Sequence, residues 1–224
     1  MNHQHELQEV AYFMRRLYRQ KLTTTSGGNI SIRLDNGDIA ITPSALDKAR
    51  ITARQVLVMD MIGNNRMPQL KPSIESGMHL AIYRARPDVQ AIVHAHPTTA
   101  TAFTLSKQTI ECDLIAESYA LLHRIARAPY ALMGTDELAT IVAEKARDAN
   151  LVMLENHGVV ALGDSLLRAF DRLELVEAAA QMTLVTSQLG NITPLCDARK
   201  MELDQMMGRE RKATATDKNQ RVLS

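Results

Sequence analysis

Two stretches of this sequence have the pattern of strands that turn straight back on themselves. Residues 30–34 alternate apolar and polar side chains, and the Asn-Gly pair at 36–37 is a strong hairpin signal before a second strand pattern at 38–42. Residues 151–163 form two apolar runs that pivot at an Asn-His-Gly turn, 156–158. Strands joined by turns this short run antiparallel, because a parallel pair needs a long crossover connection. The sheet is therefore expected to contain antiparallel pairs.

Helical patterns separate the strand patterns along the chain. The expected helices are 5–21, 73–86 with Ser73 as its cap, 135–150 with Thr135 as its cap, and 165–190, and the further expected strands are 56–61, 91–97 and 109–115. This alternation predicts one α/β domain over residues 1–207. Residues 208–224 have few apolar side chains and are predicted to be a mobile tail.

The composition excludes several classes of function. With 224 residues, 46% of them hydrophobic and 23% charged, the chain is expected to fold around a sizeable core. A net charge of +1 and the absence of tryptophan argue against nucleic acid as a partner. No apolar run is long enough for a membrane span. Two distant cysteines and the absence of a signal-peptide pattern predict a cytoplasmic protein without a disulfide framework.

Two histidines stand two residues apart in the apolar run 91–97. Side chains at positions i and i+2 of a strand project from the same face, so His94 and His96 can converge on one point. They also lie at the carboxyl end of the run, where α/β proteins usually place their active sites. The alternative is a pair of strand-end histidines that meet solvent or are satisfied by hydrogen bonds, and the pattern alone leaves this alternative open.

His157 stands in the turn at 156–158, beside Gly158, where another segment of backbone can approach closely. A third imidazole would complete three protein ligands with an open coordination position, which is the arrangement of catalytic zinc. Glu75 is placed at the first turn of a predicted helix, whose dipole favours a carboxylate. Beside a metal, Glu75 would serve as a proton-transferring base. Taken singly, His157 is equally an ordinary turn residue and Glu75 an ordinary helix-start acid.

Two short polar segments have the composition of anion-binding turns. The Ser-Gly-Gly-Asn segment 26–29 can present backbone N–H groups and an amide, and the Thr-Pro-Ser segment 42–44 supplies hydroxyls. Ser73, at a predicted helix N-terminus, is a third candidate. Each segment is equally typical of a simple turn. The remaining histidines have no comparable pattern and are expected to be surface or helix residues: His3, His5, His79 and His123.

Six motifs in this order resemble the class II aldolase and adducin family, and most closely its fuculose-phosphate aldolase branch. They are SGGNISIR (26–33), ITPS (41–44), KPSIESGMH (71–79), RPDVQAIVHAHP (86–97), APYALMGTDELA (128–139) and ENHGVVALG (155–163). Each motif is weak alone, but all six in register make a specific match that spans approximately residues 8–190.

The resemblance implies a three-layer α/β/α fold around a mostly antiparallel sheet, in a homotetramer whose active sites lie at subunit interfaces. It places Zn²⁺, with Mn²⁺ or Co²⁺ as alternatives, on His94, His96 and His157, and it makes Glu75 the acid/base residue. It assigns the substrate phosphate to Gly28, Asn29, Thr42, Ser44 and Ser73. The implied reaction cleaves a ketose 1-phosphate reversibly into dihydroxyacetone phosphate and an aldehyde. The substrate would be of the fuculose 1-phosphate kind, including deoxypentulose and methylthiopentulose 1-phosphates.

Three features depart from the family pattern. Ile74 stands where the fuculose-phosphate enzyme has a second phosphate-site serine. Ile115 stands where that enzyme has a proton-donating tyrosine, and Glu117 or Tyr119 are candidate replacements. The tail after Gly208 also lacks a tyrosine. The aldehyde part of the substrate is therefore expected to differ from that of fuculose phosphate.

Three other functions remain open. A dehydratase of methylthioribulose 1-phosphate shares the HxH pattern and a PSxE-like segment, which makes it the strongest alternative. A sugar-phosphate 4-epimerase carries aspartate at the position of Glu75, which argues against that activity here. A non-catalytic module like the adducin head domain would keep the fold as a scaffold, but the intact His94, His96, His157 and Glu75 argue against it.

Overall fold

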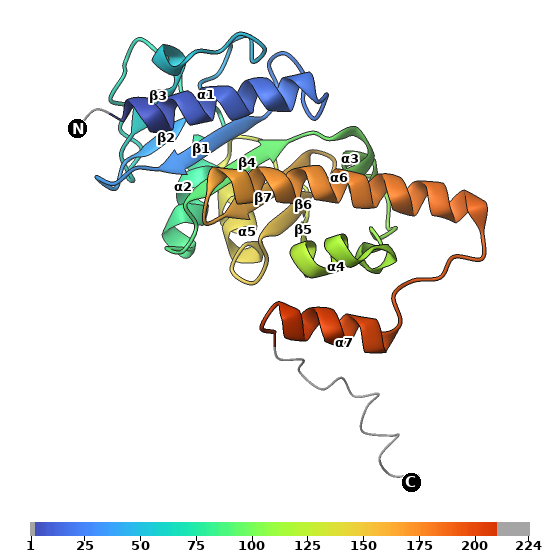
Figure 1. Cartoon of the computed structure of the whole chain (residues 1–224). Helices are drawn as coiled ribbons and strands as arrows, with labels where there is room; N and C mark the ends of the chain where they lie inside the picture. Colours follow the sequence, from blue (N-terminus) through green and yellow to red (C-terminus); the bar gives the residue numbers. More distant parts are fainter. Residues whose placement is uncertain (1–2, 210–224) are drawn as a thin grey trace.

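Strand β4 (Ala91–Ala95) is buried along its whole length at the centre of a seven-stranded sheet. The structure, a computed structural model, describes residues 3–209. The other strands are β1 (Asn29–Arg33), β2 (Ile39–Ile41), β3 (Leu57–Met59), β5 (Ile125–Ala128), β6 (Leu151–Leu154) and β7 (Gly158–Gly163). Their order across the sheet is β3-β2-β1-β4-β7-β6-β5 (Figure 1).

Both hairpins that the sequence predicts are present. Strands β1 and β2 pair antiparallel, and so do β6 and β7. All other neighbours are antiparallel too, except β5 and β6. The prediction of a mostly antiparallel sheet is therefore confirmed. In this register His94 lies between Asn29 of β1 and Val160 of β7.

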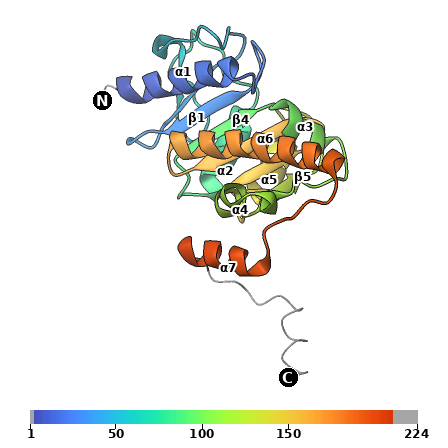
Figure 2. The same ribbon diagram turned by 45° about the vertical axis from the view of Figure 1, so that its right-hand side comes forward.

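Helices cover both faces of the sheet (Figures 1 and 2). One face carries α1 (Gln4–Arg19), α3 (Thr98–Thr104) and α6 (Leu166–Leu189), and the other carries α2 (Ser76–Ala85) and α5 (Asp136–Lys145). Val93 belongs to the hydrophobic core under α1 and α6, and Ile92 belongs to the core under α2 and α5. Because side chains alternate along a strand, His94 projects to the same face as Ile92, toward α2.

One predicted strand is wrong and another strand was missed. Residues 109–115 do not form a strand, and Cys112–Leu114 make a single 3-10 turn. Glu111 and Asp113 interrupt the apolar residues there with charges that a buried strand would have to pair. The strand that was missed is β5, which pairs in parallel with β6. Because β5 has only four residues and one of them is Arg127, its sequence pattern is too short and too polar to predict a strand.

Helix α7 (Asp197–Met206) follows the long α6 and was also not predicted. It packs against α4 (Ala116–Leu122) and stands apart from the sheet (Figure 2). In the first half of α7, Lys200 Nζ donates a hydrogen bond to Asp113 Oδ2 at 2.6 Å. Apart from its first two residues, the predicted tail 208–224 lies outside the described residues. No helix between residues 3 and 209 combines the length and the apolar character needed to cross a membrane.

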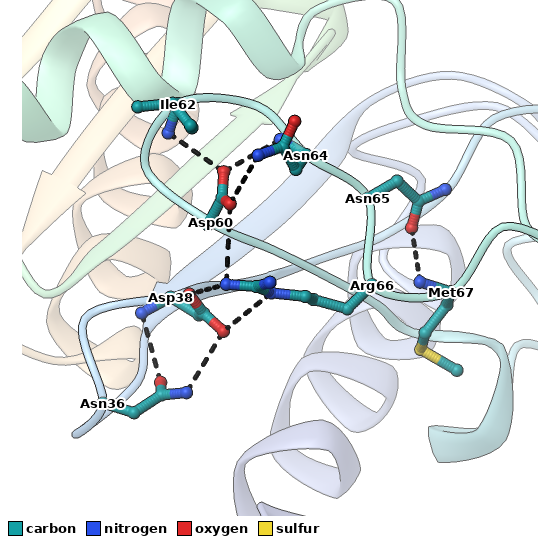
Figure 3. A network of polar contacts seen from close by, with 8 residues as sticks. All are labelled: Asn36, Asp38, Asp60, Ile62, Asn64, Asn65, Arg66 and Met67. Atoms are coloured by element: carbon teal, nitrogen blue, oxygen red, sulfur yellow. Dashed lines mark hydrogen bonds and ion pairs between the residues drawn. The ribbon is translucent and has the colours of Figure 1, made fainter.

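The edge strand β3 is covered by a returning segment of the same chain (Figure 3). After the turn at Asp60, the backbone N–H of Arg66 donates to the carbonyl of Val58 at 2.9 Å. The Arg66 guanidinium lies between the carboxylates of Asp38 and Asp60, at 3.4 and 3.5 Å (Figure 3). A strand edge whose backbone is partly paired and flanked by charge resists pairing with another chain.

A buried carboxylate of α6 fixes the start of α3, the helix that follows His96. The two carboxylate oxygens of Glu177 accept hydrogen bonds from the backbone N–H groups of Thr99 and Ala100, at 3.0 and 2.7 Å. These N–H groups belong to the first turn of the helix, where the backbone offers them no partner. Helix α6, which packs on the sheet, therefore determines where the chain runs after His96.

Replacing Glu177 by Ala should lower the free energy of unfolding by about 1–3 kcal/mol, because two N–H groups lose their acceptors in the interior. The matched control is Glu174→Ala on the same helix, which removes a half-exposed ion pair with Arg16. That change should cost less than about 1 kcal/mol. Urea denaturation measures both values, and equal losses would contradict the capping role of Glu177.

Candidate metal centre and active site

Three histidines from two distant parts of the chain meet at the end of β4. His94 lies in β4, His96 follows its last residue, and His157 stands in the turn between β6 and β7. Their ring centres are 4.8, 4.9 and 5.5 Å apart. One potential ligand atom from each residue lies within 4.8 Å of the other two. The structure thus brings together the three residues that the sequence predicts as metal ligands.

Gly158 makes this convergence possible. A Cβ at this position would lie 2.6 Å from the carbonyl oxygen of Ala95 and 2.6 Å from Cδ2 of His96. The turn before it places Asn156 at a φ of 55°, a left-handed conformation that asparagine tolerates better than most residues. The Asn-His-Gly sequence therefore suits both the turn and the close approach of the β6–β7 hairpin to the end of β4.

His94 and His96 offer neutral nitrogen donors. His94 Nδ1–H donates to the carbonyl of Val159 at 3.0 Å, which leaves the Nε2 lone pair free. This buried Nε2 has no hydrogen-bond partner among the described residues. Burial lowers the pKa of His94, and burial together with the neighbouring histidines lowers the pKa of His96 to about 3. An orphaned nitrogen beside convergent imidazoles fits a divalent ion such as Zn²⁺.

Glu75 is buried beside these rings. Its Oε2 lies 3.3 Å from His94 Nε2, and its Oε1 lies 3.1 Å from His157 Nε2. Asn29 Nδ2 donates to Oε2 at 2.7 Å. Burial alone would raise the pKa of Glu75, but the two histidines and the Asn29 hydrogen bond outweigh it and hold the pKa below its usual range. Glu75 is therefore an ionised carboxylate at neutral pH, next to the candidate metal ligands.

Ser73 does not cap α2, so that prediction is wrong. The helix begins at Ser76, and Glu75 occupies the capping position. Ser73 Oγ instead accepts hydrogen bonds from the backbone N–H of Glu75 at 3.3 Å and from Asn29 Nδ2 at 3.1 Å. Because both bonds use the oxygen as an acceptor, the hydroxyl hydrogen of Ser73 remains able to donate to a ligand.

A cavity of about 420 Å³ opens beside the histidines. Most of the predicted phosphate-binding residues line it, namely Gly28, Asn29, Ser44 and Ser73. Thr42 does not: it is fully buried, and its hydroxyl oxygen accepts the backbone N–H of Ile30 at 3.1 Å. Glu75, His96 and His157 line the same cavity, so the predicted acid/base residue and the predicted anion site share one space.

Lys48 also lines this cavity, although no sequence motif predicts a site residue there. The residue is only 1% exposed, and its Nζ donates to the carbonyl of Pro43 at 2.6 Å. Within residues 3–209 no ion pair involves Lys48. Burial lowers its pKa to about 8. A buried lysine without a carboxylate partner is rare, and here it supplies the cavity with positive charge.

Comparison with known proteins decides the family. The model of the class II aldolase and adducin N-terminal domain matches residues 8–184. The chain belongs to the class II aldolase family. A 5-deoxy-D-ribulose 1-phosphate aldolase from Bacillus thuringiensis serovar kurstaki is 32% identical to it, over 84% of this chain and 88% of that protein. A 3-oxo-tetronate 4-phosphate decarboxylase from Haemophilus influenzae is 31% identical, over 85% and 91%.

The fold agrees with this assignment. A solved structure of an L-fuculose 1-phosphate aldolase superposes on this chain with a TM-score of 0.82. Its sequence is 31% identical, and the match covers 91% of this chain and 96% of that one. The predicted class II aldolase fold is therefore confirmed, and these relatives agree with the prediction that the chain is an aldolase-type enzyme.

In this class II aldolase the candidate proton donors do not line the cavity. Glu117 is exposed on α4, and the hydroxyl of Tyr119 donates to Asp204 Oδ2 at 2.9 Å. Neither residue lines the cavity, and no tyrosine of residues 3–209 does. Glu75 is the one carboxylate among the described lining residues.

Two of the residues that line the cavity have exposed apolar side chains. Ile74 and Met133 line it and are 55% and 53% exposed. Tyr130 and Leu132, close to Met133 in the chain, are 60% and 58% exposed. Large apolar residues concentrated in one exposed place are typical of a surface that another molecule or subunit covers.

Gly158→Ala should weaken binding of a divalent metal by at least about tenfold, because the new Cβ displaces His96 from the other two histidines. Gly77→Ala is the matched control, since a Cβ there meets nothing within 4 Å. Metal analysis after dialysis against limiting Zn²⁺ measures the effect. A Gly158→Ala protein that retains the metal as the control does would show that the close approach is not required.

Proposed function

We propose that this class II aldolase uses a divalent metal, Zn²⁺ or alternatively Mn²⁺ or Co²⁺, to cleave a ketose 1-phosphate into dihydroxyacetone phosphate and an aldehyde. The observation that carries the proposal is the position of Glu75. Its carboxylate lies within 3.3 Å of two convergent histidines and lines a cavity that also contains anion-binding groups. A base, a metal site and a phosphate site in one cavity are the components that this reaction requires.

His94, His96 and His157 would hold the metal. When bound, it would act as a Lewis acid that stabilises the negative charge developing on the substrate oxygens as the carbon–carbon bond breaks. Three neutral ligands preserve most of the ion's charge for this purpose. The chain requires no Schiff-base lysine in this mechanism.

In the condensation direction, the ionised Glu75 would take the proton from the carbon of dihydroxyacetone phosphate that attacks the aldehyde, and in cleavage the protonated Glu75 would return it to the same carbon. Its low pKa makes it ionised in the resting site, and Asn29 orients it through the 2.7 Å hydrogen bond to Oε2. The lining of the cavity contains no second carboxylate and no tyrosine among the described residues. We therefore assign to a neighbouring subunit or to water the group that takes the hydroxyl proton in cleavage and returns it to the aldehyde oxygen in condensation.

The phosphate would bind at the end of the cavity formed by residues 26–29, 43–45 and 73. Lys48 offers charge, Ser73 offers a free hydroxyl hydrogen, and Ser44 a second hydroxyl. Gly28 permits close approach of the backbone, since its φ of 67° is a glycine conformation. Thr42 is not part of the proposed phosphate site, because its hydroxyl is buried and accepts the backbone N–H of Ile30.

A homotetramer with active sites at its interfaces remains part of the proposal. The exposed apolar side chains of Ile74, Tyr130, Leu132 and Met133 support it, because another subunit would cover them. Met133 would also contact the aldehyde part of the substrate, and its apolar side chain favours a short deoxygenated or thioether end over a hydroxylated one. We place the enzyme in the cytoplasm, where sugar phosphates are found.

Incubation with a panel of ketose 1-phosphates tests the reaction. The panel contains a pentulose, a 5-deoxypentulose, a methylthiopentulose and a 6-deoxyhexulose 1-phosphate. We expect dihydroxyacetone phosphate, measured with a coupled dehydrogenase, in a reaction that a chelator abolishes and Zn²⁺ restores. Loss of water with an intact carbon chain would instead identify a dehydratase, inversion of one carbon an epimerase, and release of carbon dioxide from a 3-oxo acid phosphate a decarboxylase.

The same assay separates the roles of the residues. Glu75→Gln should retain stoichiometric metal and lose at least about 100-fold in kcat, because an amide cannot accept the proton. His96→Ala should lose the metal. Cleavage by Glu75→Gln at the wild-type rate would show that its assigned role is wrong, and metal-free protein with full activity would remove the metal from the mechanism.

Lys48→Met should weaken competitive inhibition by inorganic phosphate about 10- to 100-fold, because a charge-assisted hydrogen bond is lost. In the wild type, inhibition should also weaken as the pH rises above about 8, because burial lowers the pKa of Lys48 to about 8 in the ligand-free protein and the side chain loses its charge there. Phosphate is already dianionic at this pH, so its own titration does not cause the decline. Lys107→Met, at an exposed position, is the control. Equal inhibition constants for wild type and Lys48→Met would exclude Lys48 from the phosphate site.

A further inference from the structure

A row of buried polar side chains extends from Glu75 into the interior between α2 and β1. His79 and Tyr83 share one face of α2, and Glu75 stands four residues before His79 at the capping position of the helix. Asn29 and Ser31 share one face of β1. Asn29 Oδ1 lies 2.6 Å from His79 Nε2, and Ser31 Oγ lies 2.6 Å from His79 Nδ1 and 2.9 Å from the hydroxyl of Tyr83. His79, which the sequence grouped with surface or helix residues, is fully buried.

The orientation of the Asn29 amide sets the direction of the hydrogen bonds in this row. Asn29 Nδ2 lies 2.7 Å from Glu75 Oε2 and 3.1 Å from Ser73 Oγ, and each of these oxygens can accept one of its two hydrogens. The amide oxygen of Asn29 then faces His79 and needs a donor, which must be Nε2–H. Burial lowers the pKa of His79 to about 3, so the ring is neutral and its Nδ1 accepts.

The remaining two bonds follow in the same direction. Ser31 must donate its hydroxyl hydrogen to His79 Nδ1. Its oxygen is then the acceptor for the hydroxyl of Tyr83, which is also fully buried. Burial raises the pKa of Tyr83, so the phenol keeps the hydrogen that it donates. A single arrangement of hydrogens thus satisfies the row from Tyr83 to Glu75.

This arrangement fixes the Asn29 side chain in one of its two amide orientations. If the amide turned over, its oxygen would face the Glu75 carboxylate and its NH₂ group would face His79 Nε2–H. Both contacts would be repulsive in a buried site. Ser73 reinforces the same orientation, because its oxygen accepts the second amide hydrogen of Asn29 at 3.1 Å.

We propose that His79 is a positioning residue of the active site, which acts through Asn29 to hold the Glu75 carboxylate aimed into the cavity. Its Nε2–H selects the Asn29 orientation, and Asn29 in turn binds Glu75 and Ser73. The assignment rests on the proposed role of Glu75 in aldol cleavage.

Two substitutions of His79 separate positioning from packing. His79→Leu removes both hydrogen bonds, and we expect stoichiometric metal but a kcat about 10- to 100-fold lower, with a smaller change in KM. His79→Gln can place a side-chain N–H near the position of Nε2, and it should recover most of the lost kcat. Ser118→Ala is the control for a lost buried hydrogen bond, because Ser118 is buried on α4 and donates to the backbone there.

Two outcomes in this comparison would overturn the proposal. One is a His79→Leu enzyme with the kcat of the wild type. The other is an equal loss of kcat in His79→Leu and His79→Gln, with the loss in proportion to the loss of thermal stability, as in the Ser118→Ala control.

Neutron diffraction of the wild-type protein at neutral pH tests the same proposal without activity and without a variant that has to fold. It should show deuterium on Nε2 of His79, none on Nδ1, and the ND₂ group of Asn29 facing Glu75. Deuterium on Nδ1 would overturn the proposal. If instead the wild type releases no dihydroxyacetone phosphate from any ketose phosphate, the proposed function fails, while the deuterium positions still decide how His79 and Asn29 are arranged.

Discussion

The Glu75 carboxylate is buried where α2, β1, β4 and the β6–β7 turn meet, and much of the site is arranged around its charge. A buried carboxylate is costly unless hydrogen bonds and nearby positive or polarisable groups compensate it. Here Asn29 donates to it, and His94 and His157 lie within 3.3 Å. The same contacts that stabilise the charge also place the carboxylate beside the candidate metal ligands, so stability and chemistry depend on one set of interactions.

The antiparallel centre of the sheet makes this arrangement possible. Strand β4 lies between β1 and β7, and the register places Asn29 and Val160 on either side of His94. The β6–β7 hairpin then returns His157 over the end of β4, where Gly158 leaves space for the rings. In an all-parallel sheet, neighbouring strands would be joined by long crossovers and a turn residue would not fold back onto the adjacent strand in this way.

Groups of opposite charge line the cavity. The ionised Glu75 lines it together with His96 and His157, and so does the Lys48 ammonium together with the hydroxyls of Ser44 and Ser73. A substrate that carries both a phosphate and vicinal oxygens suits such a lining. Ile74 and Met133 add exposed apolar side chains to the same cavity.

The sequence by itself determined the features that depend on local periodicity. The i, i+2 spacing of His94 and His96, the two hairpin turns and the glycine at 158 each follow from short-range geometry, and the family register added His157 and Glu75. Tertiary structure alone decided the parallel pairing of β5, the burial of Lys48 and His79, and the removal of Thr42 from the cavity. Burial of a polar residue depends on which distant segments close over it. Lysine and histidine look the same in sequence whether they face solvent or a sealed site, so only the assembled fold separates the two cases.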